Sequence, residues 1–270
     1  MGTILKYGAI FIGVFMSMVL AAAFTLGSCS AELMPKALAA DIQQVVEDVK
    51  ASSSDTFGEI QRNIDLVAEL KAEVQEAQIN GRAVSLDSVI KDIETVTQSY
   101  EKLAGQRDDI RKGLLTKIKK VEDMMAMVDS EVKSLQQKRA DYSDQLRLVA
   151  DPDPEIVRTR KEALTRAVNY VSQQIELWQA FGSIQGDIVS ELSGVEQRID
   201  SFLSMIESTA IVFREGLNLL TLQRDLNEAL SLFTSDLPRI EELTSSMEKS
   251  WDTLDFLVNS LTGVASIGIK

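Results

Sequence analysis

The sequence predicts an all-α protein: an elongated antiparallel bundle or coiled coil of about four long helices. After residue 40, apolar residues recur in alternating steps of three and four, which is the heptad pattern of packed helices. No segment keeps the alternating polarity with β-branched residues that is typical of a strand. The 270 residues include only four prolines and 6% aromatics, which suits extended helical packing better than a thick core.

The formal net charge is -13, with no histidine and a single cysteine. An acidic chain is repelled by nucleic acid and by anionic head groups, so nucleic acid is not an expected partner. The lack of histidine removes the commonest general base and the commonest nitrogen ligand for metals. One cysteine cannot form an internal disulfide, so cysteine usage alone does not reveal the redox compartment.

The N-terminus has the layout of a secretory signal. Lys6 is the only charged residue before Glu32, and it precedes an uncharged run over 7–31. A basic start followed by an apolar segment, here 10–26, is the pattern that directs export.

This segment ends in Leu26-Gly27-Ser28-Cys29, and Cys29 is the only cysteine. The four residues resemble the lipobox of bacterial lipoprotein precursors. The resemblance covers about the first 30 residues. It implies that residues 1–28 are a signal peptide removed at the amino side of Cys29, and that Cys29 is acylated on its sulfur and then on its amino group. Two or three acyl chains anchor a protein stably to a membrane.

Two other interpretations of the leader stay open. The apolar run is long enough to span a bilayer uncleaved, with the body exported. Ordinary cleavage could instead follow Ala37-Leu38-Ala39, which has the small-x-small form. In all three cases the body leaves the cytoplasm. The lipobox implies a membrane-anchored protein of the bacterial cell envelope. The residue after the cysteine is Ser30 rather than an aspartate, which resembles lipoproteins that are sorted to the outer membrane of a two-membrane cell. The body would then face the periplasm or the cell surface.

The body begins with a predicted tether over 29–40 that contains the helix-disfavouring Pro35. A first helix is expected over 41–80. Its seam, which is the row of positions in heptad spacing that faces neighbouring helices, runs from Ile42 to Ala77. It should end at Asn80-Gly81, because glycine readily adopts the left-handed conformation that follows a helix.

A second helix is predicted over 85–150, with Ser85 as its capping residue. The turn at 151–154 comes next, and a third helix over 154–233 starts with Asp153 as cap and Pro154 in its first turn. Its apolar phase shifts beyond Leu220, which indicates a bend or a change of partner. A fourth helix spans 237–262 and a flexible tail 263–270, and short links make neighbouring helices antiparallel.

Several patterns in the body suggest chemistry, each with a structural explanation that we favour. Asp151, Asp153 and Glu155 have the spacing of a calcium-binding loop, but prolines interrupt it and Ile156 replaces the required glycine. We therefore expect a capped turn. The basic segment 107–120 is expected to be a solvated helix face. The methionines at 124, 125 and 127, and the tryptophans at 178 and 251, are expected to fill the core.

No nucleophile–base pair, phosphate loop or metal cluster appears in the pattern, so no catalytic residue, metal or cofactor is predicted, apart from the covalent lipid. The expected function is that of a lipid-anchored coiled-coil spacer, scaffold or protein-docking surface. One alternative is a membrane-active bundle, such as a pore-forming toxin or adhesin, with 210–222 as its nearest insertion segment. Another is a single-pass protein with an exported helical domain. The sequence names no protein partner, and heptad seams also allow a homo-oligomer.

Overall fold

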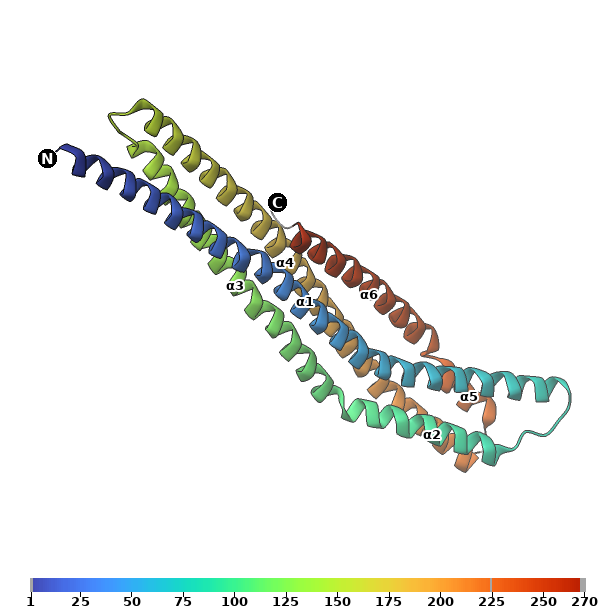
Figure 1. Ribbon diagram of the computed structural model, residues 1–270. Coiled ribbons are helices and arrows are strands. Elements are labelled where there is room, and N and C mark those ends of the chain that lie inside the picture. The colour runs from blue at the N-terminus through green and yellow to red at the C-terminus, as the bar shows by residue number, and fades with distance from the viewer. Residues whose placement is uncertain (1, 224, 268–270) are drawn as a thin grey trace. The chain divides into compact units, whose positions relative to one another are not determined.

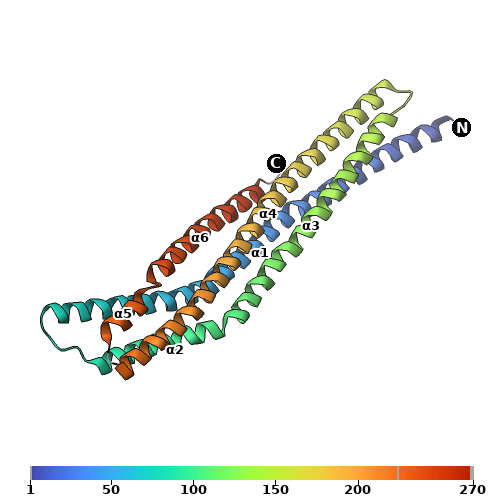
Figure 2. The same ribbon diagram turned by 180° about the vertical axis from the view of Figure 1, so that it is seen from behind.

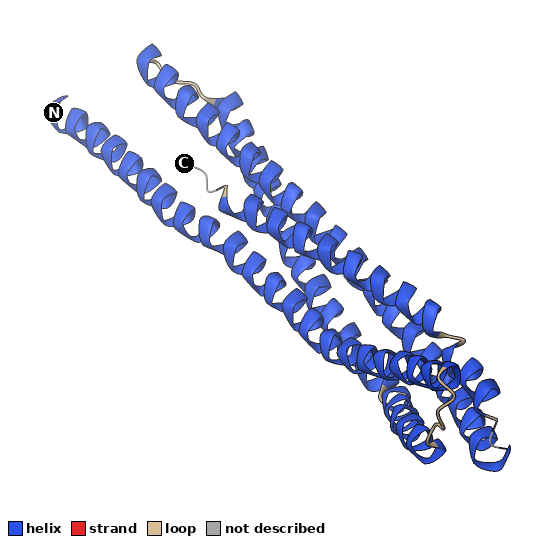
Figure 3. Ribbon diagram, turned by 90° about the vertical axis from the view of Figure 1, so that its right-hand side faces the viewer, coloured by secondary structure: helices blue, strands red, loops and turns tan. Residues whose placement is uncertain are grey.

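In the computed structural model, the backbone is described for residues 2–223 and 225–267, and the side chains for 35–222 and 225–267. This part of the chain is helical throughout except for short connections, and it contains no strand (Figure 3). The all-α prediction is therefore confirmed. In chain order the elements are α1 (Gly2–Ile79), α2 (Leu86–Gly105), α3 (Arg107–Leu148), α4 (Pro154–Asn218), the π-helical turn η1 (Leu219–Gln223), α5 (Leu226–Thr234) and α6 (Leu237–Ser266) (Figure 1).

The chain divides into two compact units. Unit 1 comprises Met1–Gln43, Ala126–Ile184 and Val258–Lys270, and unit 2 comprises Gln44–Met125 and Gln185–Leu257. Four helices, α1, α3, α4 and α6, contribute residues to both units. Each unit has buried residues of its own and is described separately.

Local signals explain where most helices begin and end. The Ser85 side chain accepts a hydrogen bond from Ser88 N and caps α2. The Asp225 side chain accepts a hydrogen bond from Glu228 N and caps α5 in the same way. After α1, Gly81 has φ 63°, and Arg82 N donates to Ala77 O at 2.8 Å, which closes the helix end as in a Schellman motif.

The start of the body differs from the expected tether. Pro35 lies inside α1, and the helix continues through 35–40 without a break. Leu38, Ala39 and Ile42 are all buried in unit 1. A proline inside a helix costs about 3 kcal/mol, whereas burying one leucine or isoleucine side chain contributes about 1.5–3 kcal/mol. Burial of this face therefore outweighs the local preference of Pro35.

Two of the expected long helices are interrupted. The predicted helix over 85–150 is divided into α2 and α3 at Gln106, where the two helices meet at an angle (Figures 1 and 2). The predicted helix over 154–233 gives way after Asn218 to η1 and then to α5. The described part of the chain thus has six α-helices and a π-helical turn where four helices are expected.

The core of unit 1 draws on four helices. Leu38 and Ile42 come from α1, and Val128 and Leu135 from α3. From α4, Trp178 and Phe181 are both about 1% exposed and pack edge to face with ring centroids 5.7 Å apart. The segment of α6 in this unit adds Val258, Leu261 and Ala265.

In unit 2, side-chain contacts show which helices are neighbours. Contacts between α1 and the α2–α3 segment join Asn63 to Ser99 and Asp48 to Lys117, so these chain segments run in opposite directions. The same holds for α3 and α4, which are joined by Arg107–Asp200 and by Gln185–Val121. An aromatic cluster of Tyr100, Phe213 and Phe233 fills the core where α2, α4 and α5 meet.

Candidate functional site

The predicted lipidation site cannot be built from side-chain geometry. Leu26, Gly27, Ser28 and Cys29 lie outside the residues whose side chains the structure describes. The lipobox therefore stays a prediction from sequence. The sites discussed below belong to the described part of the chain.

The turn at 151–154 is held by capping interactions. Asp151 Oδ1 accepts a hydrogen bond from Asp153 N, and Asp153 Oδ1 accepts one from Glu155 N, both at 2.9 Å. Two of the three carboxylates that share the spacing of a calcium loop, those of Asp151 and Asp153, therefore bind backbone amides in the turn and in the first turn of α4. Within the described residues, no group of three or more potential ligands is arranged to hold a metal ion.

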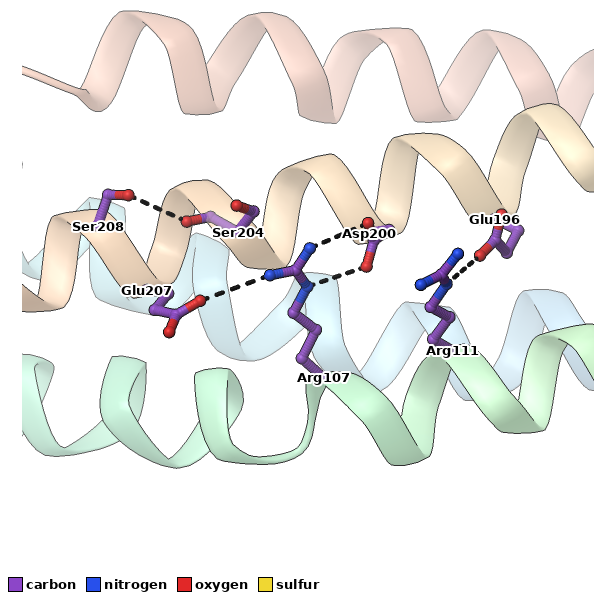
Figure 4. Close-up of polar contacts among 7 residues, drawn as sticks. All are labelled: Arg107, Arg111, Glu196, Asp200, Ser204, Glu207 and Ser208. Atoms are coloured by element: carbon purple, nitrogen blue, oxygen red, sulfur yellow. Dashed lines mark hydrogen bonds and ion pairs between the residues drawn. The ribbon is translucent and has the colours of Figure 1, made fainter.

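The most organised charged cluster joins α3 to α4 in unit 2 (Figure 4). The Arg107 guanidinium donates through Nε to Asp200 Oδ1 at 2.9 Å and through Nη2 to Asp200 Oδ2 at 3.0 Å. Its third nitrogen, Nη1, reaches Glu207 Oε2 at 3.5 Å. A planar guanidinium that faces a planar carboxylate in this way forms a strong, directional ion pair.

A second pair lies one turn later in α3 and one turn earlier in α4. Arg111 Nε donates to Glu196 Oε1 at 2.8 Å, and Glu196 is only 7% exposed as a residue (Figure 4). Since Glu196 precedes Asp200 by four residues and Arg111 follows Arg107 by four, the two pairs form a ladder between helices of opposite direction. We call these five residues (Arg107, Arg111, Glu196, Asp200 and Glu207) the ion-pair ladder.

The electrostatics of the ladder follow from its hydrogen bonds. The bonds from Arg107 stabilise the carboxylate of Asp200 and lower its pKa below the ordinary value of 3.8. In turn, the hydrogen bonds to Asp200 and Glu196 raise the pKa of Arg107 and of Arg111. Each charge is thus stabilised by its partner, and the ladder fastens the start of α3 to α4.

The basic segment 107–120 was expected to be a solvated helix face, and the ladder changes that interpretation for part of it. Besides Arg107 and Arg111, Lys117 Nζ donates to Asp48 O at 2.7 Å and to Ser52 Oγ at 3.1 Å on α1. The partners in these contacts are 65 to 100 residues apart in sequence, so the charge pattern of the segment gives no signal of them.

A polar network joins α1 and α2 at Asn63, a polar residue at a position of the heptad seam that runs from Ile42 to Ala77. Asn63 Nδ2 donates to Ser99 Oγ at 2.7 Å, and Ser99 Oγ donates to Glu59 Oε1 at 2.9 Å. Lys102 Nζ lies 3.6 Å from the same Glu59 oxygen. The polar interruption of the heptad at Asn63 was the available signal, although it does not identify the partners.

Two buried polar atoms in unit 2 have no hydrogen-bond partner among the described residues: the hydroxyl of Tyr100 and Oε1 of Gln185. Gln185 Nε2 donates to Val121 O at 3.0 Å, so this amide is only half satisfied. Burial raises the pKa of the Tyr100 hydroxyl.

The methionines, the tryptophans and the segment 210–222, which the sequence also singled out, lie in or beside the helical core. Trp178 and Met124 are buried, Met125 and Trp251 are partly buried, and Met127 is 43% exposed. In the segment 210–222, Phe213 and Leu220 are buried in unit 2, and Arg214 pairs with Glu101. Among the residues whose side chains the structure describes, 35–222 and 225–267, no helix has an apolar stretch long enough to cross a membrane.

The polar contacts described above thus hold helices together. Comparison of the chain with protein-family models, with curated proteins and with solved structures found no match.

Proposed function

We propose that this chain is a lipid-anchored helical protein of the bacterial cell envelope that acts as a spacer, scaffold or protein-docking surface. The observation that carries the proposal is the position of the only cysteine. Cys29 follows Leu26-Gly27-Ser28 at the end of an apolar segment and precedes a helical body. Acylation of Cys29 would tether the body to the membrane surface. Ser30 favours the outer membrane where the cell has two membranes.

The packing of the body supports a mechanical role. Its neighbouring segments in unit 2 run in opposite directions, and ion pairs and polar networks fix their register. We propose that these helices form an antiparallel coiled-coil bundle over most of the body. A fixed register suits a protein that must hold two points apart or present one face to a partner.

Metabolic labelling with an alkyne fatty acid tests the anchor. We expect the full chain to incorporate the label in a bacterial host, and Cys29→Ala to lose it, because acylation needs the thiol. Ser30→Ala is the matched control, since it alters the neighbouring residue but leaves the thiol, and we expect it to retain the label. Equal labelling of the parent and Cys29→Ala would show the lipoprotein proposal to be wrong.

The mass of the mature N-terminus separates the other readings of the leader. Cleavage before Cys29 gives a chain that starts at residue 29 and carries acyl groups. An intact chain that starts at Met1 would favour a transmembrane anchor, and a chain that starts at residue 40 would favour plain secretion. Either of the last two results would replace the lipid anchor in this proposal.

A further inference from the structure

The α3–α4 hairpin of unit 1 ends in a segment without a buried residue. Burial stops at Leu135 in α3 and resumes at Ala167 in α4, and none of the 31 residues between them is buried. We call residues 136–166 the hairpin end. Each of its two arms spans 13 helical residues and is therefore about 20 Å long.

The hairpin end nevertheless keeps the apolar pattern of a packed helix pair. Leu146, Val149, Val157 and Leu164 are only partly covered, and Leu148 and Ile156 are 81% and 44% exposed. The two arms extend from the packed parts of α3 and α4, and most of the stability of an amphipathic helix comes from covering its apolar face. The face of α4 that carries Pro154, Val157, Arg158, Lys161, Glu162, Thr165 and Arg166 is nearly flat and open.

The charges of the hairpin end are divided between its tip and its arms. The tip carries three acidic residues, Asp151, Asp153 and Glu155, and no basic one. The arms carry seven basic residues (Lys138, Arg139, Arg147, Arg158, Arg160, Lys161 and Arg166) against three acidic ones (Asp141, Asp144 and Glu162). The segment therefore has a net charge of +1, whereas the rest of the chain carries -14.

We propose that a second copy of this chain covers the hairpin end. Two hairpin ends that overlap about a twofold axis place the acidic tip of each copy against the basic arms of the other, so the surface is complementary to itself. The two copies together supply four helices, enough to close a bundle around the half-covered seam. The exposed Leu148 and Ile156 of one copy then lie against the other copy instead of water.

The same charge pattern disfavours other occupants. An anionic membrane or a nucleic acid would attract the arms but repel the acidic tip. Two copies that meet at any other position bring together surfaces of a chain whose remaining net charge is -14. Because the overlap is short, we expect the area of the dimer interface to be small for a specific complex. The dissociation constant should lie in the micromolar range, at about 1–100 µM.

A pair of charge variants of the full chain tests the proposal. The tip variant is Asp151→Lys with Glu155→Lys, and it keeps Asp153 because that residue caps α4. The arm variant is Arg139→Glu, Arg160→Glu and Lys161→Glu, all exposed positions. Each variant places charges of one sign on both tip and arms, so each should repel its own copies, whereas the tip of either variant complements the arms of the other.

The readout is capture of one tagged chain by another in a mild detergent, which does not depend on the lipid anchor. We expect the parent to capture itself, each variant to capture itself about tenfold less, and the mixture of the two variants to recover capture to near the parent level. Circular dichroism checks that both variants keep the helical content of the parent. Undiminished self-capture by either variant, or a mixture no better than its components, would overturn the proposal.

A photo-crosslinking residue at Leu148 in the full chain identifies the occupant directly. A product with the mass of two chains supports the second copy, with the same residue at the exposed Glu69 of α1 as a control expected to give none. A lipid adduct, a crosslink to the chain's own residues 1–34, a crosslink to another protein, or no product at all would each contradict it.

Discussion

The aromatic ring of Phe233 in α5 lies directly against the backbone of α4 at Gly216. A Cβ atom at position 216 would stand 2.7 Å from Phe233 Cζ and 3.2 Å from Cδ1, well inside contact distance. Phe233 is about 1% exposed, and its ring packs edge to face on Phe213 with centroids 4.9 Å apart. Position 216 therefore needs glycine so that α5 can fold back onto α4.

We expect Gly216→Ala to destabilise the protein, because the new methyl group displaces a fully buried ring. Overpacking of this kind costs about 1–3 kcal/mol, which exceeds the gain of roughly 1 kcal/mol from replacing a helical glycine by alanine. Urea unfolding followed by circular dichroism measures the difference in the free energy of unfolding.

Gly113→Ala is the matched control for this change. Gly113 lies in α3, and a Cβ built there meets nothing within 4 Å. Only the helix propensity changes, so this variant should be more stable than the parent by about 0.5–1 kcal/mol. If both glycine variants shifted stability in the same direction, the close contact with Phe233 would not explain the role of Gly216.

The pair of Arg107 and Asp200 makes stability depend on pH. The pKa of Asp200 lies below its ordinary value of 3.8 in the folded chain, because Arg107 donates two hydrogen bonds to the carboxylate. The unfolded chain regains the ordinary pKa. The stabilisation is therefore fully present above that value and is lost as the pH falls through the lower, folded pKa.

We expect Asp200→Asn to be less stable than the parent near neutral pH by about 1 kcal/mol or less, since the pair is partly exposed. The parent should then lose more of its stability than the variant as the pH falls from about 5 to below the ordinary pKa of 3.8. Thermal unfolding at a series of pH values measures this convergence. Asp252→Asn removes an exposed carboxylate from α6 and controls for net charge. A difference between parent and Asp200→Asn that did not change with pH would contradict the assignment.

Local features of the fold were the predictable ones. Ser85, Asp153 and Gly81 act on the backbone within four residues of themselves, so the sequence alone contains the physical cause of each cap or helix end. The change of apolar phase beyond Leu220 likewise marks the place where α4 gives way to η1 and α5.

Features that depend on distant residues were not predictable. Pro35 argues for a break, yet the burial of Leu38 and Ile42 keeps α1 helical through it. Arg107 and Asp200 are 93 residues apart, and nothing in either neighbourhood selects the other. Nor can a heptad seam show whether it is covered: Leu146 and Leu164 have seam spacing but remain partly exposed in the hairpin end. The candidate lipidation site, by contrast, rests on sequence alone.

The buried amide of Gln185 tests whether a polar side chain in the core of unit 2 lowers the stability of the folded chain. Its Nε2 donates to Val121 O, but its Oε1 has no partner among the described residues, and a buried unpaired acceptor costs about 1–3 kcal/mol. Gln185→Met keeps a similar volume and removes the unpaired atom together with the hydrogen bond to Val121 O. We expect the free energy of unfolding to rise by about 1 kcal/mol. Gln185→Ala leaves a cavity instead and should be destabilising. A loss of stability in Gln185→Met would contradict this expectation and show that the hydrogen bond to Val121 O outweighs the cost of the unpaired Oε1.

The buried hydroxyl of Tyr100 should make the folded chain less stable at alkaline pH. Its hydroxyl is buried without a partner beside Phe213, and burial raises its pKa in the folded chain above the ordinary value of 10.0. Folding therefore favours the neutral phenol. The stability of the parent is unaffected below the ordinary pKa and falls as the pH rises above it, because only the unfolded chain can then ionise this tyrosine freely.

Tyr100→Phe removes this dependence together with an unpaired buried hydroxyl. We expect the variant to be at least as stable as the parent near neutral pH and to unfold at a higher pH on alkaline titration. Near-ultraviolet absorbance of ionised tyrosine and circular dichroism, recorded on the same samples, should show that the last tyrosine of the parent ionises only as the helices unfold. Tyr142→Phe, at a partly exposed position in the hairpin end, should leave that late phase in place. The assignment fails if the late phase persists in Tyr100→Phe, since another tyrosine would then be the one that ionises on unfolding.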